Sequence, residues 1–120
     1  MRKIRECHYA FFSSLKKAYN EKGVTLFEIH EYDKAICCFD KCIEIDPTDS
    51  DYYANKAATL LNIEQYDNAL EVINKAIELN SNDSSTHNIR GRLNNKIFIN
   101  YTIYLCYKKF RYYFVKFKKL

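Results

Sequence analysis

The sequence predicts an all-α protein in which consecutive helices pair into hairpins. Three observations support this prediction. The 120 residues include only two glycines and one proline, too few turn formers for an all-β fold. The chain repeats itself with a period of 34 residues. Within each repeat the apolar residues follow the three- and four-residue steps of one helical face.

The repeat defines the organisation of the chain. Residues 16–49 align with residues 50–83 without a gap, and 12 of the 34 positions are identical. Because a period of this length indicates stacked units, the sequence divides into five segments. These are a cap or lead-in helix at 1–14, a first repeat at 15–49, a second repeat at 50–83, a partial third repeat at 84–96 and a basic aromatic tail at 97–120.

Each complete repeat is expected to contain two helices. In the first repeat, one helical face runs from Tyr19 to Ile29. A second periodic run starts near Tyr32 and ends at Asp46-Pro47, because proline disfavours a helical residue before it. The connectors supply side chains that cap the next helices, namely Thr48-Asp49-Ser50 and Asn82-Asp83-Ser84.

Small residues mark the places where two helices come close together. Gly23 and Ala57 occupy equivalent positions in the first helices, and Ala35 and Ala69 do so in the second helices. A larger side chain there would force the helices apart, with overpacking of roughly 1–3 kcal/mol.

The two repeats share a specific pattern of residue types. The first copy reads Tyr19-x-x-Lys22-Gly23-x-x-Leu26, then Tyr32-Asp33-x-Ala35 and Phe39; the second reads Tyr53-x-x-Lys56-Ala57-x-x-Leu60, then Tyr66-Asp67-x-Ala69, Ile73 and Ala76. This pattern resembles the tetratricopeptide repeat family. The resemblance implies an α-solenoid with two complete repeats and a partial third. The residues expected to set repeat packing are Tyr19, Gly23, Leu26, Tyr32, Ala35, Phe39, Tyr53, Ala57, Leu60, Tyr66, Ala69 and Ala76.

The resemblance also implies a non-enzymatic protein-interaction module. In a stack of helix pairs the first helices line the concave side, and their side chains off the packing face form a groove for a peptide or helix. The candidate groove residues are Lys17, Asn20, Val24, Phe27, Asp51, Asn55, Ala58, Leu61, Asn62, Asn88 and Arg92.

The residue types in the groove determine which partner is expected. Some members of the family hold the terminal carboxylate of heat-shock chaperones with Lys, Asn and Arg side chains on three successive first helices. Only Asn55 matches that set here, and the equivalents of the other four residues are Asn20, Val24, Ser85 and Ile89. A carboxylate without facing cations is unfavourable, so strong binding of a chaperone tail is not expected. The expected partner is a protein or peptide rather than a small molecule, and self-association at the open repeat edge is a further hypothesis.

Charge divides the chain in two. Residues 1–90 carry 11 basic and 15 acidic residues, whereas residues 91–120 carry eight basic residues and no acidic residue. In the tail, Ile103, Tyr107, Phe110, Phe114 and Phe117 follow helical spacing, which predicts a helix that covers the open edge of the array.

Two alternatives for the tail stay open. The repeat pattern stops abruptly after Leu93, so the tail can also come from sequence outside the repeat protein, such as a change of reading frame. Lysines interleaved with aromatic residues also suit a membrane surface or a nucleic acid. A solvated basic end is the simpler explanation, and neither membrane nor nucleic acid is the expected partner.

The sequence predicts no catalytic, cofactor or metal site. Cys38 and Cys42 are one helical turn apart, but structural zinc needs four ligands at recognisable spacings. None of the three histidines has a defined relation to a cysteine, as nucleophilic catalysis would require. Two distant glycines cannot form a phosphate-binding loop.

The remaining expectations concern location. Five cysteines without a CxxC pair, no signal-peptide pattern and no apolar run of about 20 residues favour a reduced, cytoplasmic protein. An alternative to a stand-alone interaction module is a fragment or accessory piece of a larger repeat protein.

Overall fold

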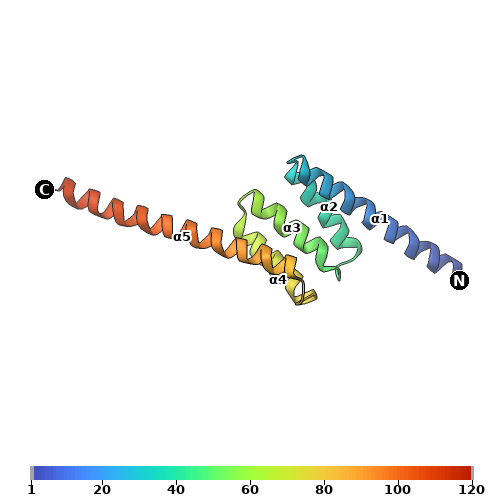
Figure 1. Cartoon of the computed structure of the whole chain (residues 1–120). Helices are drawn as coiled ribbons and strands as arrows, with labels where there is room; N and C mark the ends of the chain where they lie inside the picture. The colour runs from blue at the N-terminus through green and yellow to red at the C-terminus, as the bar shows by residue number, and fades with distance from the viewer. Residues whose placement is uncertain (1, 120) are drawn as a thin grey trace.

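The computed structural model describes residues 2–119, which form five α-helices and no strand (Figure 1). The bounds are α1 Arg2–Glu28, α2 Tyr32–Ile45, α3 Ser50–Asn62, α4 Tyr66–Leu79 and α5 Ser84–Lys118. Helix α1 packs on α2, α3 packs on α4, and the first part of α5 packs on α4 and α3. The all-α prediction, with two helix hairpins and the first helix of a third, is confirmed.

The two hairpin turns share one geometry. His30 and Glu64, which are equivalent in the repeat, both adopt a φ of 64°. After the first of them, Glu31 N donates a hydrogen bond to Leu26 O at 2.8 Å, and the same bond recurs in the second turn at 3.0 Å. A left-handed residue followed by a bond back to the last helical turn ends α1 and α3 and reverses the chain.

Aspartates cap the helices that start each new repeat, as the sequence predicted. The Asp49 carboxylate accepts a hydrogen bond from Asp51 N at 3.0 Å, and the Asp83 carboxylate accepts from Ser85 N at 3.1 Å and Thr86 N at 3.2 Å. These bonds satisfy N–H groups that have no partner within the helix.

The core lies between the paired helices, which approach each other closely at Gly23. A Cβ built on Gly23 would lie 2.7 Å from Cε1 of Phe39, whose side chain is 1% exposed. Of the predicted packing residues, the buried ones are Gly23, Ala35, Phe39, Ala57, Leu60, Ala69 and Ala76, and the half-buried ones are Tyr19, Leu26, Tyr32, Tyr53 and Tyr66. Small residues thus lie where the helices approach.

Helix α5 starts as the first helix of a third repeat. Thr86 and Leu93 on this helix are fully buried, and Leu93 joins the core cluster of the second repeat. The open face of α4 is therefore covered by residues 84–97 rather than by the tail.

The expectation that the tail returns over the open edge of the array is wrong. The position equivalent to His30 and Glu64 is Phe98, which lies within α5. A bulky residue is strongly disfavoured at positive φ, so the turn does not form and the helix continues. The side chains of residues 98–118 are exposed, and the molecule is 84 Å long (Figure 1).

The N-terminal segment also continues a repeat helix. Residues 2–14 form the first half of α1 and their side chains are exposed. Met1 lies outside the described residues.

Candidate functional site

The first helices of the three repeats share one side of the molecule. Helix α3 contacts both α1 and α5. The surface that these three helices present is called here the three-helix face, and its candidate residues come from α1 (Lys17, Asn20, Val24, Phe27), α3 (Asp51, Asn55, Ala58, Leu61, Asn62) and α5 (Asn88, Arg92).

An amide pair joins α1 to α3 on this face. Asn55 Nδ2 donates a hydrogen bond to Asn20 Oδ1 at 3.1 Å, and both side chains are half-buried. Each amide has two N–H donors and a carbonyl oxygen that accepts two hydrogen bonds. One bond between the pair leaves most of this capacity available to a peptide backbone.

A cavity of about 240 Å³ lies between α3 and α5. It is lined by Leu61, Asn62, Glu64, Tyr66, Arg92 and Lys96. Three predicted groove residues meet in it: Leu61, Asn62 and Arg92. With two basic residues against one acidic residue, the cavity carries a positive charge.

The other predicted groove residues differ in how much of each side chain is accessible on the face. Val24 is 37% exposed, and Phe27 packs edge-to-face on Tyr32 with ring centroids 5.7 Å apart. Leu61 is 7% exposed and belongs to the core cluster, so its side chain lies beneath the surface of the face and offers little area to a ligand. Of the remaining predicted groove residues, Lys17 and Asn88 are exposed and Ala58 is half-buried.

The opposite end of the face is acidic. Asp51 lies in the first turn of α3, near the caps Asp49 and Asp83. Partial burial raises the pKa of Asp51, and the negative charges of Asp49 and Asp83 raise it further. The face therefore runs from a negative end at the start of α3 to a positive end at its last turn.

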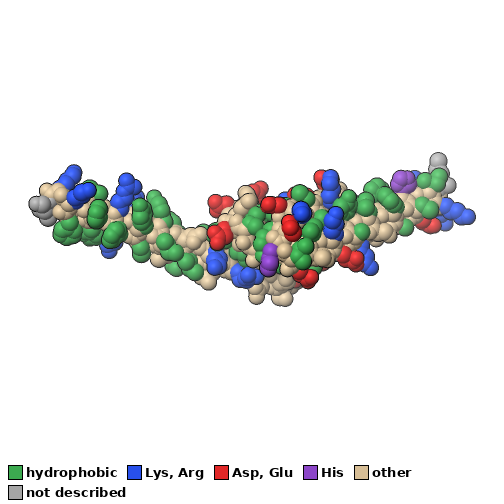
Figure 2. Space-filling view, turned by 90° about the horizontal axis from the view of Figure 1, so that it is seen from above, with side chains coloured by type: hydrophobic (Ala, Val, Ile, Leu, Met, Phe, Trp, Pro, Cys, Tyr) green, Lys and Arg blue, Asp and Glu red, His purple; other side chains and the backbone are tan. Residues whose placement is uncertain are grey.

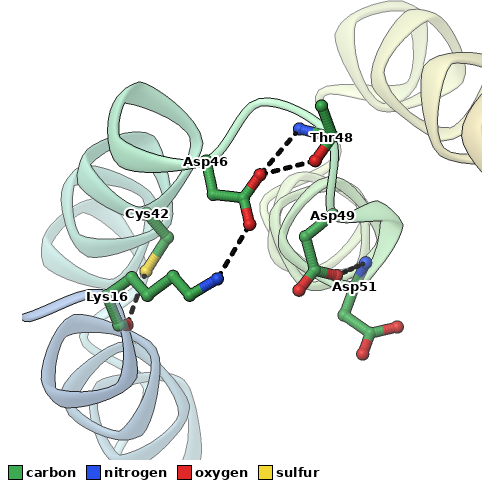
Figure 3. A network of polar contacts seen from close by, with 6 residues as sticks. All are labelled: Lys16, Cys42, Asp46, Thr48, Asp49 and Asp51. Carbon is green, nitrogen blue, oxygen red and sulfur yellow. Dashed lines mark hydrogen bonds and ion pairs between the residues drawn. The ribbon is translucent and has the colours of Figure 1, made fainter. Parts of the chain in front are cut away.

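A polar network fixes this acidic end (Figure 3). Lys16 Nζ of α1 donates to Asp46 Oδ2 at 2.8 Å, while Thr48 donates to Asp46 Oδ1 from its backbone N at 3.1 Å and its hydroxyl at 2.6 Å. The Lys16 bond, followed by the Thr48 bonds, lowers the pKa of Asp46 to about 2. Cys42 Sγ donates to Lys16 O at 3.3 Å, and burial raises the pKa of Cys42 to about 11.

Sequence reasoning missed Lys96 and the Lys16–Asp46 pair. Lys96 follows Arg92 by one helical turn, so its spacing could have placed it beside the groove. The contact of Lys16 with Asp46 spans 30 positions and carries no local signal.

A larger cavity lies elsewhere, at the junction of the repeats. It measures about 480 Å³ and is lined by residues of α2, α3 and α4. Its Lys56 Nζ and Asp40 Oδ1 form an ion pair at 2.6 Å, which links α3 to α2. This cavity therefore lies where the two repeats meet, and most of the charged side chains that line it form ion pairs with one another.

Residues 2–119 contain no group of three or more His, Cys, Asp or Glu side chains placed to hold a metal ion. Across that same range, no helix combines the length and apolar content needed to span a bilayer.

Stacked hairpins of helices with a 34-residue period place this chain among the helical-repeat proteins. Tetratricopeptide repeat family models match residues 17–49 and residues 38–71. Residues 17–71 are therefore tetratricopeptide repeats. Among proteins of curated function, none matches this chain.

Solved structures share the fold. The first tetratricopeptide repeat domain of Spaghetti (RPAP3), bound to the HSP90 peptide SRMEEVD, is 27% identical with a TM-score of 0.66 over 68% of this chain. The second domain of human RPAP3, in complex with the HSP70 peptide SGPTIEEVD, is 26% identical with a TM-score of 0.62 over 70% of this chain and 68% of its own. The Arabidopsis OM64 domain, at 20% identity and a TM-score of 0.70 over 76% of this chain and 74% of its own, agrees in fold. The present chain spans 64% of the length of the Spaghetti domain.

Proposed function

We propose that this chain is a non-enzymatic interaction module that binds an extended peptide segment of a partner protein on its three-helix face. The observation that carries the proposal is the Asn20–Asn55 amide pair beside the cationic cavity at Arg92 and Lys96. Amides can bond a peptide backbone whatever its sequence, and the charged ends of the face supply selectivity.

The charges define the ligand more closely. Asp51 and Leu61 are ten positions apart in α3, which is about 15 Å along the helix axis. An extended peptide covers this distance in about four or five residues. The face is complementary to a segment with a basic side chain near Asp51 and an acidic side chain near Arg92, separated by that interval.

The relatives suggest a specific alternative, because the RPAP3 domains are seen with chaperone peptides. We propose that this chain binds such a tail weakly. Of the positions equivalent to the carboxylate-holding set, Ile89 is half-buried against the core and Val24 is apolar. The nearby Asp51 and Asp83 carboxylates repel a terminal carboxylate.

The proposal is tested on the full chain with an array of short synthetic peptides in which the Lys-to-Glu interval varies. We expect binding to be strongest at an interval of about four or five residues. Arg92→Ala with Lys96→Ala should remove the preference for the acidic residue, and Asn55→Ala should weaken all peptides. The matched control is Lys34→Ala with Lys41→Ala, which removes two cations of α2 away from the face.

The chaperone alternative is tested in the same assay with the peptide SRMEEVD. We expect affinity for it at least tenfold below that for the preferred array peptide, a difference of about 1.4 kcal/mol. Equal or tighter binding of SRMEEVD that is lost in Asn55→Ala would replace the proposed ligand class. Array binding that is unchanged in both face variants would refute the use of this face.

A further inference from the structure

The C-terminal part of α5 is a free helix with an apolar seam. Residues 98–118 are exposed and extend away from the repeats (Figures 1 and 2). The large side chains among them include Ile103 at 61%, Phe110 at 68% and Phe117 at 68% exposed. Exposed aromatic residues in this number indicate a surface that has a partner.

The seam follows a heptad pattern. Its members are Ile99, Ile103, Cys106, Phe110, Tyr113 and Phe117. The steps between them are four, three, four, three and four residues, the alternation of a and d positions in a coiled coil. All six are uncharged, and the six basic residues between 108 and 119 occupy other positions. A seam that repeats every seven residues stays aligned with a partner helix through left-handed supercoiling.

We propose that residues 97–118 of α5 pair in parallel with the same residues of a second copy of this chain, as a short two-stranded coiled coil. In the heptad, Ile103, Phe110 and Phe117 take position a, and Ile99, Cys106 and Tyr113 take position d. The pairing is independent of peptide binding on the three-helix face.

The seam starts where the repeats end. The two preceding heptad positions are Lys96 and Arg92, both exposed and both unsuited to an a/d interface. Leu93, which packs on the repeats, points about 120° around the helix from the seam. The repeat domains of two paired copies therefore lie outside the coiled coil and do not obstruct it.

Charge selects the parallel orientation. Lys109 and Lys116 hold position g, and Tyr107 and Phe114 hold position e. In a parallel pair, position g of one helix faces position e of the other, so Lys109 meets Phe114 of the second copy. An antiparallel pair would bring the g-position lysines of the two copies together. A lysine can lie over an aromatic ring here: Lys116 Nζ is 6.0 Å from the centre of the Tyr112 ring within the helix.

The size of the interface sets its strength. Three seam aromatics in each copy, each able to bury about 150 Å², give on the order of 900 Å² in the pair. This is near the lower limit of specific interfaces. We therefore expect association that depends on concentration in the range of about 1–100 µM.

The native Cys106 provides the test. In the full chain with Cys7→Ser and Cys37→Ser, mild oxidation should give a covalent dimer through Cys106 of both copies, because equivalent d positions meet in a parallel pair. Moving the thiol to Ile99→Cys in a Cys106→Ser background should also give the dimer, whereas Leu105→Cys in that background should not. Dimer from Cys106 but not from Ile99→Cys would overturn the parallel register.

A matched pair of tyrosines tests the seam without cysteine chemistry. Tyr113→Asp places a charge in the seam, and Tyr112→Asp places the same charge one residue away, outside it. Both side chains are exposed, so neither change removes core packing. Sedimentation velocity at about 100 µM should show the Tyr112→Asp chain as a dimer and the Tyr113→Asp chain as a monomer.

Salt separates self-association from binding to an anionic membrane. Raising NaCl from about 0.1 M to about 0.5 M screens repulsion between the basic helices, so the dimer should persist or strengthen. Vesicles containing phosphatidylserine serve as the competing probe. A chain that is monomeric at both salt levels, and that sediments with these vesicles only at low salt, would overturn the proposal in favour of a lipid surface.

Discussion

The two glycines of this chain lie at equivalent positions of two repeats but in opposite environments, and substitutions there should have opposite effects on stability. A Cβ on Gly23 would lie 2.7 Å from Cε1 of the buried Phe39 ring, whereas a Cβ on Gly91 would meet nothing within 4 Å. Both residues lie within helices, where replacing glycine by alanine gains up to about 1 kcal/mol.

The magnitude at Gly23 follows from two terms. The ring of Phe39 is 1% exposed and cannot move aside without disturbing its neighbours, so overpacking is expected to cost about 1–3 kcal/mol. The helical gain offsets part of this, and Gly23→Ala should destabilise the chain by about 1 kcal/mol, up to about 2. Gly91→Ala lacks the overpacking and should stabilise by about 0.5–1 kcal/mol.

The assay is urea unfolding of the two single variants and the parent chain, followed by circular dichroism. The second repeat supplies a rescue, because it has Ala57 and Ile73 at the positions of Gly23 and Phe39, both fully buried. Gly23→Ala combined with Phe39→Ile should therefore be less destabilised than the sum of the single changes by at least about 0.5 kcal/mol. Equal stabilisation by Gly23→Ala and Gly91→Ala would refute the reasoning, because the close contact would then have no energetic effect.

Three further predictions follow from the polar and capping contacts. The pKa of Asp46 is lowered to about 2 in the folded chain, so its contribution to folding stability is complete above the unfolded pKa of about 4 and is lost as the pH falls toward 2. Between about pH 4 and about pH 2, the midpoint of urea unfolding should therefore change less in Asp46→Asn than in the parent chain or in the control Glu71→Gln. In a thiol titration at about pH 8, the exposed Cys7 and Cys37 should react rapidly, and so should Cys106 at protein concentrations below about 1 µM, where the coiled coil does not form. The buried Cys38 and Cys42 should react only on unfolding, since burial raises the pKa of Cys42 to about 11, and fast reaction of all five thiols would contradict the packing. Asp83→Ala removes the cap of α5 and should destabilise the chain by about 1 kcal/mol, whereas Asp83→Asn should retain most of the stability because asparagine also caps helices. Equal losses of stability in the two variants would assign the effect to the charge of Asp83 rather than to capping.

The sequence predicted the helix hairpins because each depends on local signals. The apolar steps and the capping residues lie within a few positions of the structure that they specify, and the 34-residue period repeats these local signals. Asp49 and Asp83 act as the caps expected of them. Contacts between residues far apart in the sequence have no such local signal. Nothing near Lys16 in the sequence indicates its bond to Asp46, and nothing in α3 alone shows that Leu61 would be buried in the core cluster with Leu93.

The three-helix face could be predicted only in part for the same reason. Helical spacing predicted Asn20 and Asn55 as residues of one groove, but it could not show that their amides form a hydrogen bond between α1 and α3. The cationic cavity requires the pairing of α3 with α5, which brings Arg92 and Lys96 beside Asn62.

Phe98 explains why one sequence repeat can end in two different ways. The signals that start a third repeat are present: Asp83 caps it, Gly91 occupies the position of Gly23, and Leu93 is buried. The hairpin then needs a residue at positive φ, which His30 and Glu64 supply and a bulky aromatic residue disfavours. With the turn lost, the segment that would have formed a second helix continues in line. The small residues of a second helix are lost as well, because Ile103 and Phe110 stand at the positions of Ala69 and Ala76. The apolar side chains of the continued helix are therefore left exposed for another molecule to cover.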